Sequence, residues 1–166
     1  GLLFLPYLTG ERTPHKDPYA KGAFVGLSLR HTKAHMARAV LEGVAFGMRD
    51  GLEIIREMGV SVTEVRASGG GARSALWRQI LADTGRAPMV TINVDEGPAY
   101  GAAILASVAA GMYGAVEEAC DAIIAQTGRL EPHAQTADDY DAWFHEYQAA
   151  YQALAPGFRR VAQRLG

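Results

Sequence analysis

Three consecutive glycines, Gly69, Gly70 and Gly71, are the strongest chemical signal in the sequence. They follow an alternating, strand-like run and precede a helical pattern, so the turn is expected at the carboxyl end of a strand. Glycine lets the backbone approach a ligand closely, and the amides that begin a helix attract a phosphate or the polar edge of a nucleotide. A tight corner that needs positive φ would use the same residues, so both interpretations stay open.

Two nucleotide-binding motifs can be compared with this turn. A P-loop requires GxxxxGK[ST], but the residue five positions after Gly69 is Ser74 and no lysine follows it, which excludes that motif. A dinucleotide-binding turn requires GxGxxG, and Gly69, Gly71 and Ser74 match two of its three positions. Asp95, after the next predicted strand, would then bind the ribose. A nicotinamide-dependent oxidoreductase therefore remains an alternative.

The other reactive side chains favour structural roles. The histidines show no HExxH pattern, and His31 and His35 share only a four-residue helical spacing, so no metal site is predicted. Glu42 lies on the apolar face of a predicted helix and is expected to be a hydrogen-bonded structural carboxylate. Arg12 is expected to form a surface salt bridge. Trp77, on the helix after the glycines, is expected to pack in the core rather than against adenine.

The elements that would position these residues alternate between strand and helix. Strands are expected within residues 1–8, 23–29, 62–68 and 89–94, and a polar loop covers residues 9–22. Helices are expected from the cap Thr32 to about Met58, over 73–84, from Pro98 to Gly111 and over about 116–126. This order predicts an α/β protein in which ligands bind beyond the carboxyl ends of strands.

The last predicted helix begins at the cap Thr136, has Asp138 and Asp139 in its first turn, and is interrupted at Pro156. It carries an aromatic stripe that is expected to pack in the core, formed by Tyr140, Phe144, Tyr147 and Tyr151.

Composition narrows the class of protein. The 166 residues are 49% hydrophobic and 20% charged, which is enough for one domain with a good core. Sixteen Lys and Arg against eighteen Asp and Glu give a net charge of -2 without a basic block, so neither nucleic acid nor a membrane surface is an expected partner. One cysteine excludes an internal disulfide, and a cytoplasmic location is the default.

Four blocks carry a resemblance to a known family. In order, they are LPYLTGERTPHKDPYAKGAFVGL, HMARAVLEGVAFGMRDGL, SGGGARSALWRQILADTGRAPM and GPAYGAAILA. Together they resemble the C-terminal domain of the FGGY carbohydrate kinases, most closely the xylulokinases, over roughly residues 1–110. The resemblance implies an actin-like, ribonuclease-H-type α/β fold with a mixed sheet flanked by helices. It also implies transfer of the γ-phosphate of ATP, with Mg²⁺, to a sugar such as D-xylulose, giving xylulose 5-phosphate.

The same resemblance assigns site residues. Gly70, Gly71 and Ala72 would line the nucleotide, with Arg73 and Ser74 as neighbours at the start of the helix. The loop with Thr9, Gly10 and Arg12 can face the cleft between the kinase domains. Small residues at Gly97, Pro98 and Gly101 would permit close packing of a helix on the sheet.

The resemblance also implies what lies outside this chain. In the family, the aspartate that acts as general base and nearly all sugar contacts belong to the N-terminal domain. No catalytic residue is assigned here, although Asp17, Asp83 and Asp95 are available carboxylates. Residues 1–166, which open without Met inside an apolar run, are expected to be a C-terminal nucleotide-binding fragment. Expected partners are the sugar, ATP and the N-terminal kinase domain; a homodimer and a non-catalytic actin-like binding module are left open.

Overall fold

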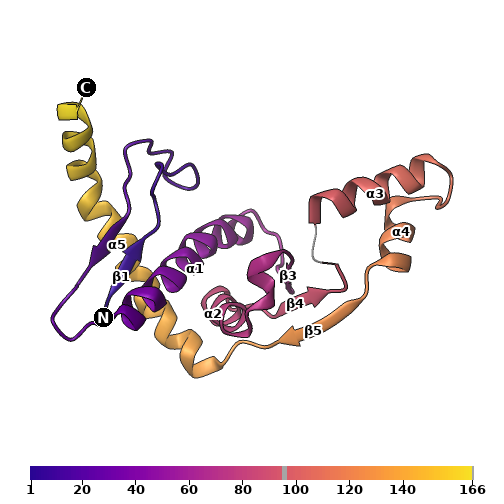
Figure 1. Cartoon of the computed structure of the whole chain (residues 1–166), viewed down its shortest axis with the longest axis horizontal. Helices are drawn as coiled ribbons and strands as arrows, with labels where there is room; N and C mark the ends of the chain where they lie inside the picture. Colours follow the sequence, from indigo (N-terminus) through magenta and orange to yellow (C-terminus); the bar gives the residue numbers. More distant parts are fainter. Residues whose placement is uncertain (95–96, 166) are drawn as a thin grey trace. The chain divides into compact units, whose positions relative to one another are not determined.

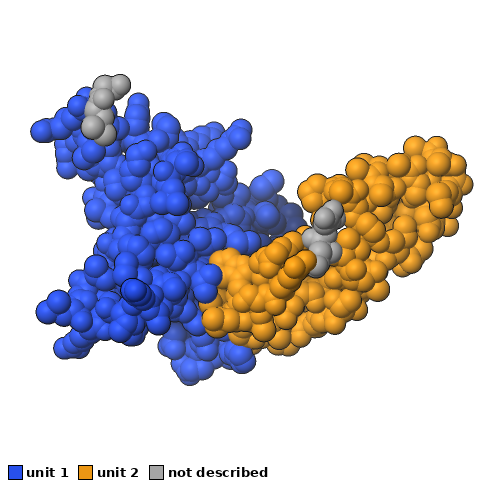
Figure 2. Space-filling view, viewed as in Figure 1, with its two compact units in different colours: residues 1–62, 83–86, 133–166 blue, residues 63–82, 87–132 orange. Residues whose placement is uncertain are grey.

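The computed structural model describes residues 1–94 and 97–165. The chain divides into two compact units, which Figure 2 shows in blue and orange. The first unit contains residues 1–62, 83–86 and 133–166, and the second contains residues 63–82 and 87–132. In the described part of the chain, the helices are too short or too polar to cross a membrane.

The first unit combines a small sheet with two long helices (Figure 1). Strands β1 (Leu3–Leu5) and β2 (Ala23–Val25) pair antiparallel, and α1 (Lys33–Glu57) and α5 (Ala134–Leu165) pack with β1. Strand β2 is shorter than the predicted run over 23–29, because the chain turns where the Ser28 amide donates to Nδ1 of His31.

Helix α1 begins and ends where the sequence predicts. Thr32 caps it, and the Thr32 amide donates to Nδ1 of His35, one turn into the helix, at 3.1 Å. At the other end Gly59 has φ +84°, a conformation that glycine adopts without a steric penalty.

The predicted aromatic stripe forms the core of the first unit, as expected. Its rings pack with Phe46 of α1, and the hydroxyls of Tyr7 and Tyr147 form a buried hydrogen bond of 2.6 Å. The largest contribution to core stability is the removal of these apolar rings from water. The buried members are Leu5, Tyr7, Ala20, Phe46, Tyr140, Phe144, Tyr147, Tyr151 and Ala155.

Helix α5 differs from its prediction at both the start and Pro156. It begins at Ala134 rather than at Thr136, because the His133 amide donates to the Asp83 carboxylate just before it. It also continues through Pro156, although proline removes one helical hydrogen bond. Packing accounts for the continuity: Tyr151 is buried before the proline and Phe158 packs on the same core after it.

The second unit is built on a three-stranded mixed sheet. Strand β4 (Met89–Ile92) lies in the middle, parallel to β3 (Val65–Ala67) and antiparallel to β5 (Gln126–Leu130). Its helices are α2 (Ala75–Gly85), whose last residues belong to the first unit, α3 (Gly97–Ala109) and α4 (Val116–Ile123).

Strand β5 was not predicted from the sequence. The predicted helix over 116–126 ends at Ile123, where the Asn93 side chain donates to the Ile123 carbonyl and accepts from the Ala125 amide. These two bonds turn the chain into the strand register beside β4. The polar sequence QTGRL has little strand pattern of its own, so pairing decides its structure.

Candidate functional site

The glycine turn lies directly after β3. Gly69 has φ +78°, and a short 3₁₀ helix over Gly70–Arg73 leads into α2. The Ala72 amide donates to the Gly69 carbonyl at 3.0 Å, and the Ser74 amide donates to the Gly71 carbonyl at 3.2 Å. The sequence predicted that a helix begins at Arg73 and that the amides at its start are open to a ligand. This is wrong for two of those amides, because the extra turn uses them and α2 begins at Ala75.

The three glycines differ in the physical constraints on their positions. Gly69 adopts positive φ, which confirms that this turn contains a corner. A Cβ atom on Gly71 would lie 3.2 Å from the indole Nε1 of Trp77, so packing limits that position. Gly70 has neither constraint: it is exposed, its φ is not positive, and no atom lies within 4 Å of its ideal Cβ position. Gly70 therefore presents open backbone at the end of β3.

The two polar neighbours of the turn, Arg73 and Ser74, lie in different surroundings. Ser74 caps α2, because its hydroxyl accepts the Trp77 amide at 3.2 Å. Arg73 is exposed at the end of the 3₁₀ helix. Trp77 is only half-buried and lies over Gly71, so the prediction that it packs in the core is wrong.

Sequence analysis missed Arg78, which supports the turn from α2. Its Nη1 donates to the carbonyl of Ala72 at 2.9 Å. Its Nε is buried and has no hydrogen-bond partner among the described residues. The available signal was spacing, because Arg78 lies one helical turn after the cap Ser74. This side chain brings a positive charge beside the backbone of the glycine turn.

The start of α3 comes close to the same turn. A Cβ atom on Gly97 would lie 3.2 Å from Oγ of Ser68, the residue before the glycines, so Gly97 allows a close approach to the turn. Ser68 lies outside β3, so this contact does not test the predicted packing of the helix on the sheet. At Gly101 the prediction of close packing is wrong, because the space around its Cβ position is empty. Both glycines instead line an apolar cavity of about 340 Å³, whose other walls are Ile92, Val94, Tyr100, Ile104, Leu105, Val116, Cys120 and Ile124.

The available carboxylates are structural where the structure describes them. Asp17 is fully buried and accepts the Tyr19 amide and the Tyr151 hydroxyl, both at 2.9 Å. Burial raises the pKa of Asp17, but these hydrogen bonds and the charge of Arg159 outweigh it, so its pKa lies below the ordinary value. Asp83 accepts the His133 amide at 2.7 Å. Asp95 lies outside the described residues.

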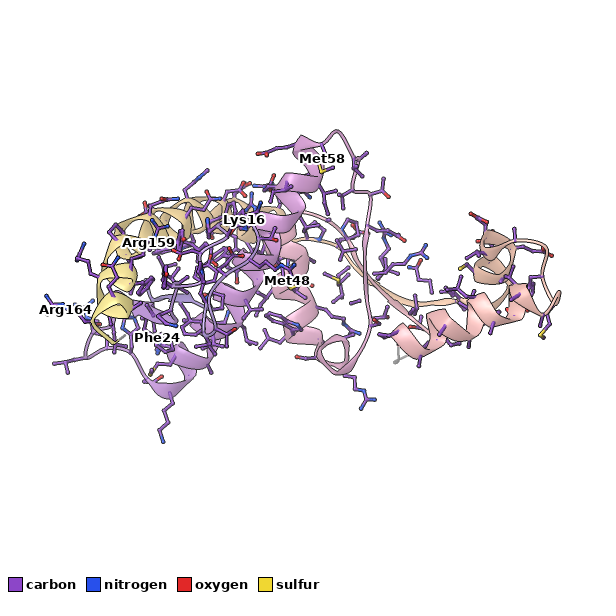
Figure 3. The ribbon with its side chains drawn as sticks, turned by 90° about the horizontal axis from the view of Figure 1, so that it is seen from above. Lys16, Phe24, Met48, Met58, Arg159 and Arg164 are labelled. Atoms are coloured by element: carbon purple, nitrogen blue, oxygen red, sulfur yellow. The ribbon has the colours of Figure 1, made fainter. Side chains whose placement is uncertain are left out.

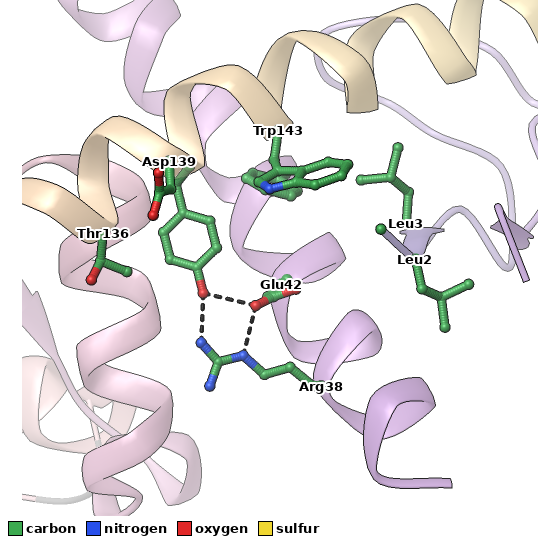
Figure 4. Close-up of a pocket in the computed structure, with 10 residues that line it drawn as sticks. Leu2, Leu3, Arg38, Glu42, Thr136, Asp139 and Trp143 are labelled. Atoms are coloured by element: carbon green, nitrogen blue, oxygen red, sulfur yellow. Dashed lines mark hydrogen bonds and ion pairs between the residues drawn. The ribbon is translucent and has the colours of Figure 1, made fainter. Parts of the chain in front are cut away.

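Glu42 has the structural role that the sequence predicted (Figure 4). Its Oε1 accepts from Nε of Arg38 at 2.6 Å and from the hydroxyl of Tyr140 at 2.8 Å, and Arg38 also donates to Tyr140. Burial, with the Glu42 hydrogen bond, raises the pKa of Tyr140 to about 12. This cluster lies at a cavity of about 300 Å³ that is also lined by Leu2, Leu3, Phe46, Thr136, Asp139 and Trp143.

The predicted surface salt bridge of Arg12 is wrong. Arg12 is exposed and forms no ion pair or hydrogen bond with another described residue. With Thr9 and Gly10 it lines a separate surface cavity of about 410 Å³ in the first unit.

Comparisons with known proteins agree on one family. Residues 1–110 match the model of the FGGY family of carbohydrate kinases, C-terminal domain. The chain is 40% identical to the xylulose kinase of Staphylococcus epidermidis over 92% of its length, and 42% identical to that of Escherichia coli over 98%. It spans 31% of the length of each of these relatives.

Solved structures show the same similarity. The ligand-bound xylulose kinase from Lactobacillus acidophilus superposes with a TM-score of 0.86 at 34% identity, covering 96% of this chain and 32% of that one. The Plasmodium falciparum glycerol kinase with ADP gives a TM-score of 0.75 at 18% identity, covering 90% of this chain and 30% of that one, which supports the fold alone. The predicted α/β, actin-like fold with a mixed sheet is confirmed.

Proposed function

Because this chain belongs to the FGGY family of carbohydrate kinases, we propose that it is the ATP-binding part of an enzyme that phosphorylates D-xylulose to xylulose 5-phosphate. The observation that carries this proposal is the similarity to xylulose kinases along almost the whole chain. A gluconokinase from Bacillus subtilis is also among the similar proteins, so gluconate is the sugar substrate to compare directly.

The glycine turn is the proposed nucleotide contact. Gly70 leaves open backbone, Gly71 beside it is also exposed, and the partly buried Ala72 follows in the same short helix. A backbone without side chains allows a phosphodonor to approach closely, while Arg78 and Ser74 hold the turn in one conformation. Binding at a preformed turn costs little ordering entropy, which favours orientation of ATP for transfer.

Mg²⁺ would be held mainly through the phosphates of ATP. The described residues offer no group of three His, Cys, Asp or Glu side chains that could form a protein cage for a metal ion. Mg²⁺ commonly keeps several waters and binds through substrate phosphates, and it would neutralise charge during phosphoryl transfer. The residues of this chain contribute the positioning of the nucleotide.

The rest of the proposed mechanism involves an N-terminal domain. We infer that it supplies the sugar contacts and the general base, because the two available carboxylates that are described are engaged in structural hydrogen bonds. Closure of the two domains would bring the γ-phosphate to the sugar hydroxyl and exclude water. Such an enzyme would use the ATP of the cytoplasm.

The partial GxGxxG match does not favour an oxidoreductase once the turn is seen. Gly69 meets the conformational need of the corner and Gly71 meets the packing need of Trp77. Both matching positions are thereby explained within the chain, and the family is one of kinases.

A coupled assay on the full-length protein tests the proposal. With Mg²⁺ and ATP, we expect D-xylulose to give ADP formation with a higher kcat/KM than gluconate or glycerol. ADP formation with gluconate alone would refute the substrate and keep the kinase. Binding of NAD without binding of ATP in calorimetry would refute the kinase itself.

A further inference from the structure

A polar turn over residues 9–18 carries two positive charges that are unpaired among the residues that the structure describes. Within it the chain reverses on itself: the Glu11 amide donates to the Asp17 carbonyl at 2.9 Å, and the Asp17 amide donates to the Glu11 carbonyl at 2.8 Å. Arg12 and Lys16 lie between these two residues and are exposed. Neither side chain forms an ion pair or hydrogen bond with another described residue.

Contacts with helix α5 fix the turn to the core of the first unit. The buried carboxylate of Asp17 accepts the hydroxyl of Tyr151, and Nη2 of Arg159 lies 3.6 Å from the same oxygen. The ring of His15 stacks on Tyr151 with centroids 3.8 Å apart. Figure 3 labels Lys16 at the turn and Arg159 on α5, both in the first unit. A segment held at two points in this way keeps its exposed side chains in a defined place.

The backbone of the turn is also strained. Lys16 has φ +48°, a conformation that residues with side chains rarely adopt. Arg86 has the same φ, but its guanidinium is held by the carboxylates of Asp138 and Asp141. The side chain of Lys16 forms no ion pair with a described residue that would offset the cost of this conformation. Strain that the surrounding structure enforces is concentrated at ligand-binding sites, so the turn is a candidate for one.

The carboxylate of Glu11, which lines the same cavity as Arg12 and Lys16, accepts a hydrogen bond within the turn. Oε2 of Glu11 accepts the backbone amide of His15 at 2.7 Å. This bond stabilises the carboxylate inside the turn, so that it does not pair with Arg12 or Lys16. Thr9 adds a hydroxyl to the same cavity of about 410 Å³. The site therefore offers two positive charges, one hydroxyl and a glycine backbone beside the engaged Glu11 carboxylate, and Arg12 and Lys16 form no ion pair with another described residue.

We propose that the cavity lined by Thr9, Gly10, Glu11, Arg12, Lys16 and Pro18 is a binding site for a single terminal phosphate group, with Arg12 and Lys16 as its cationic partners. Arginine presents two parallel N–H donors to phosphate oxygens, and lysine supplies a second, compact positive charge. Two cationic side chains line the cavity, a number that suits a single phosphate group rather than a polyanion. The site itself does not rest on the proposed function; only the identity of the ligand that carries the phosphate group, a sugar phosphate or ATP, rests on it.

A titration of the 166-residue chain followed by NMR tests this site. The probes are inorganic phosphate, xylulose 5-phosphate and ATP, each at constant ionic strength against potassium chloride. We expect saturable shifts of the Gly10, Arg12 and Lys16 amides. Arg12→Gln should weaken binding by roughly tenfold, as expected for the loss of a hydrogen bond to a charged group.

The matched control is Lys21→Gln, because Lys21 is exposed, forms no ion pair or hydrogen bond within the described ranges 1–94 and 97–165, and does not line the cavity. Its affinity should equal that of the wild type. Lys16→Gly is a second variant, because it removes the charge and relieves the strain, so it should fold and still lose affinity.

Three results would overturn the proposal: shifts that do not saturate, shifts that chloride reproduces, or equal weakening by Lys21→Gln and Arg12→Gln. If xylulose 5-phosphate binds more tightly than inorganic phosphate, the ligand of the site is the product of the proposed reaction. If ATP binds more tightly than inorganic phosphate, the ligand is the phosphate donor. Shifts at Gly70 are recorded in the same spectra, so failure of the nucleotide turn and failure of this site can be told apart.

Discussion

Alanine at each of the three glycines separates the corner of the turn from the nucleotide contact. Gly69→Ala forces a side chain into φ +78°, which costs about 1–2 kcal/mol. A less flexible unfolded chain returns about 0.4–1 kcal/mol, so a net loss of about 1 kcal/mol is expected. Gly70→Ala meets no atom and no strained φ, so only the gain of about 0.4–1 kcal/mol remains. At Gly71 the Trp77 ring must shift by a few tenths of an ångström, which places Gly71→Ala between the other two.

Nucleotide binding should follow a different order. A methyl group on Gly70 occupies the open space that the proposed ATP contact uses, so the apparent KM for ATP should rise by roughly tenfold or more, equivalent to about 1.4 kcal/mol. The KM for the sugar should stay unchanged. Gly71→Val should likewise raise the KM for ATP far more than that for the sugar, although displacement of Trp77 makes it less clean.

Urea unfolding of this chain measures the order of stability among the variants. Steady-state kinetics of the full-length enzyme measures the order of their KM values for ATP. Gly51→Ala is the matched control, because Gly51 lies within α1 with nothing near its Cβ position; it should gain about 0.8–1 kcal/mol without changing the KM for ATP. If Gly70→Ala is the least stable variant, the geometry of the turn is wrong. If it is stable and its ATP kinetics are those of the wild type, the nucleotide assignment fails.

Three further changes probe the buried polar groups. Asp17→Asn should lower the free energy of unfolding by about 1–3 kcal/mol at pH 7. The folded pKa of Asp17 is lowered, so the stabilisation from its carboxylate is present above pH 3.8 and is lost as the pH falls through the folded pKa. The stabilities of the wild type and of Asp17→Asn, measured by urea unfolding, should therefore converge in acid. Asp50 has the opposite pH dependence. Burial raises its pKa, and this effect is larger than the lowering by the hydrogen bond from Gln148. Asp50 therefore stabilises the fold below pH 3.8 and loses that contribution as the pH rises through its folded pKa. Asp50→Asn should therefore be at least as stable as the wild type at pH 7, and lower stability in urea would contradict this. Arg78→Met should remove about 1 kcal/mol and speed hydrogen exchange at the Ala72 amide, whereas unchanged exchange would show that Arg78 does not support the turn.

Features set by local sequence were predictable. Thr32 and Gly59 marked the ends of α1, because capping and positive φ act within a few residues of the helix terminus. The stripe on α5 identified the core of the first unit, since helical spacing brings its aromatic residues to one face. The glycine run likewise marked a turn at the end of a strand.

Features set by partners distant in sequence were not predictable. Strand β5 depends on hydrogen bonds to β4, and the continuity of α5 through Pro156 depends on packing on both sides of the proline. Local sequence also could not predict that Arg12 forms no ion pair with another described residue, because ion pairing depends on which carboxylates surround the folded turn. Local propensities differ by less than the free energy that such tertiary contacts supply.

By itself the sequence determined the family, the α/β class and the position of a glycine turn after a strand, because residue types and their spacing carry that information directly. Only the tertiary structure decided that Gly69 makes the corner, that Gly71 accommodates Trp77 and that Gly70 is left open. The physical reason is that φ and the space around a Cβ atom depend on the folded surroundings of each residue. Three identical letters in the sequence therefore have three different roles in the fold.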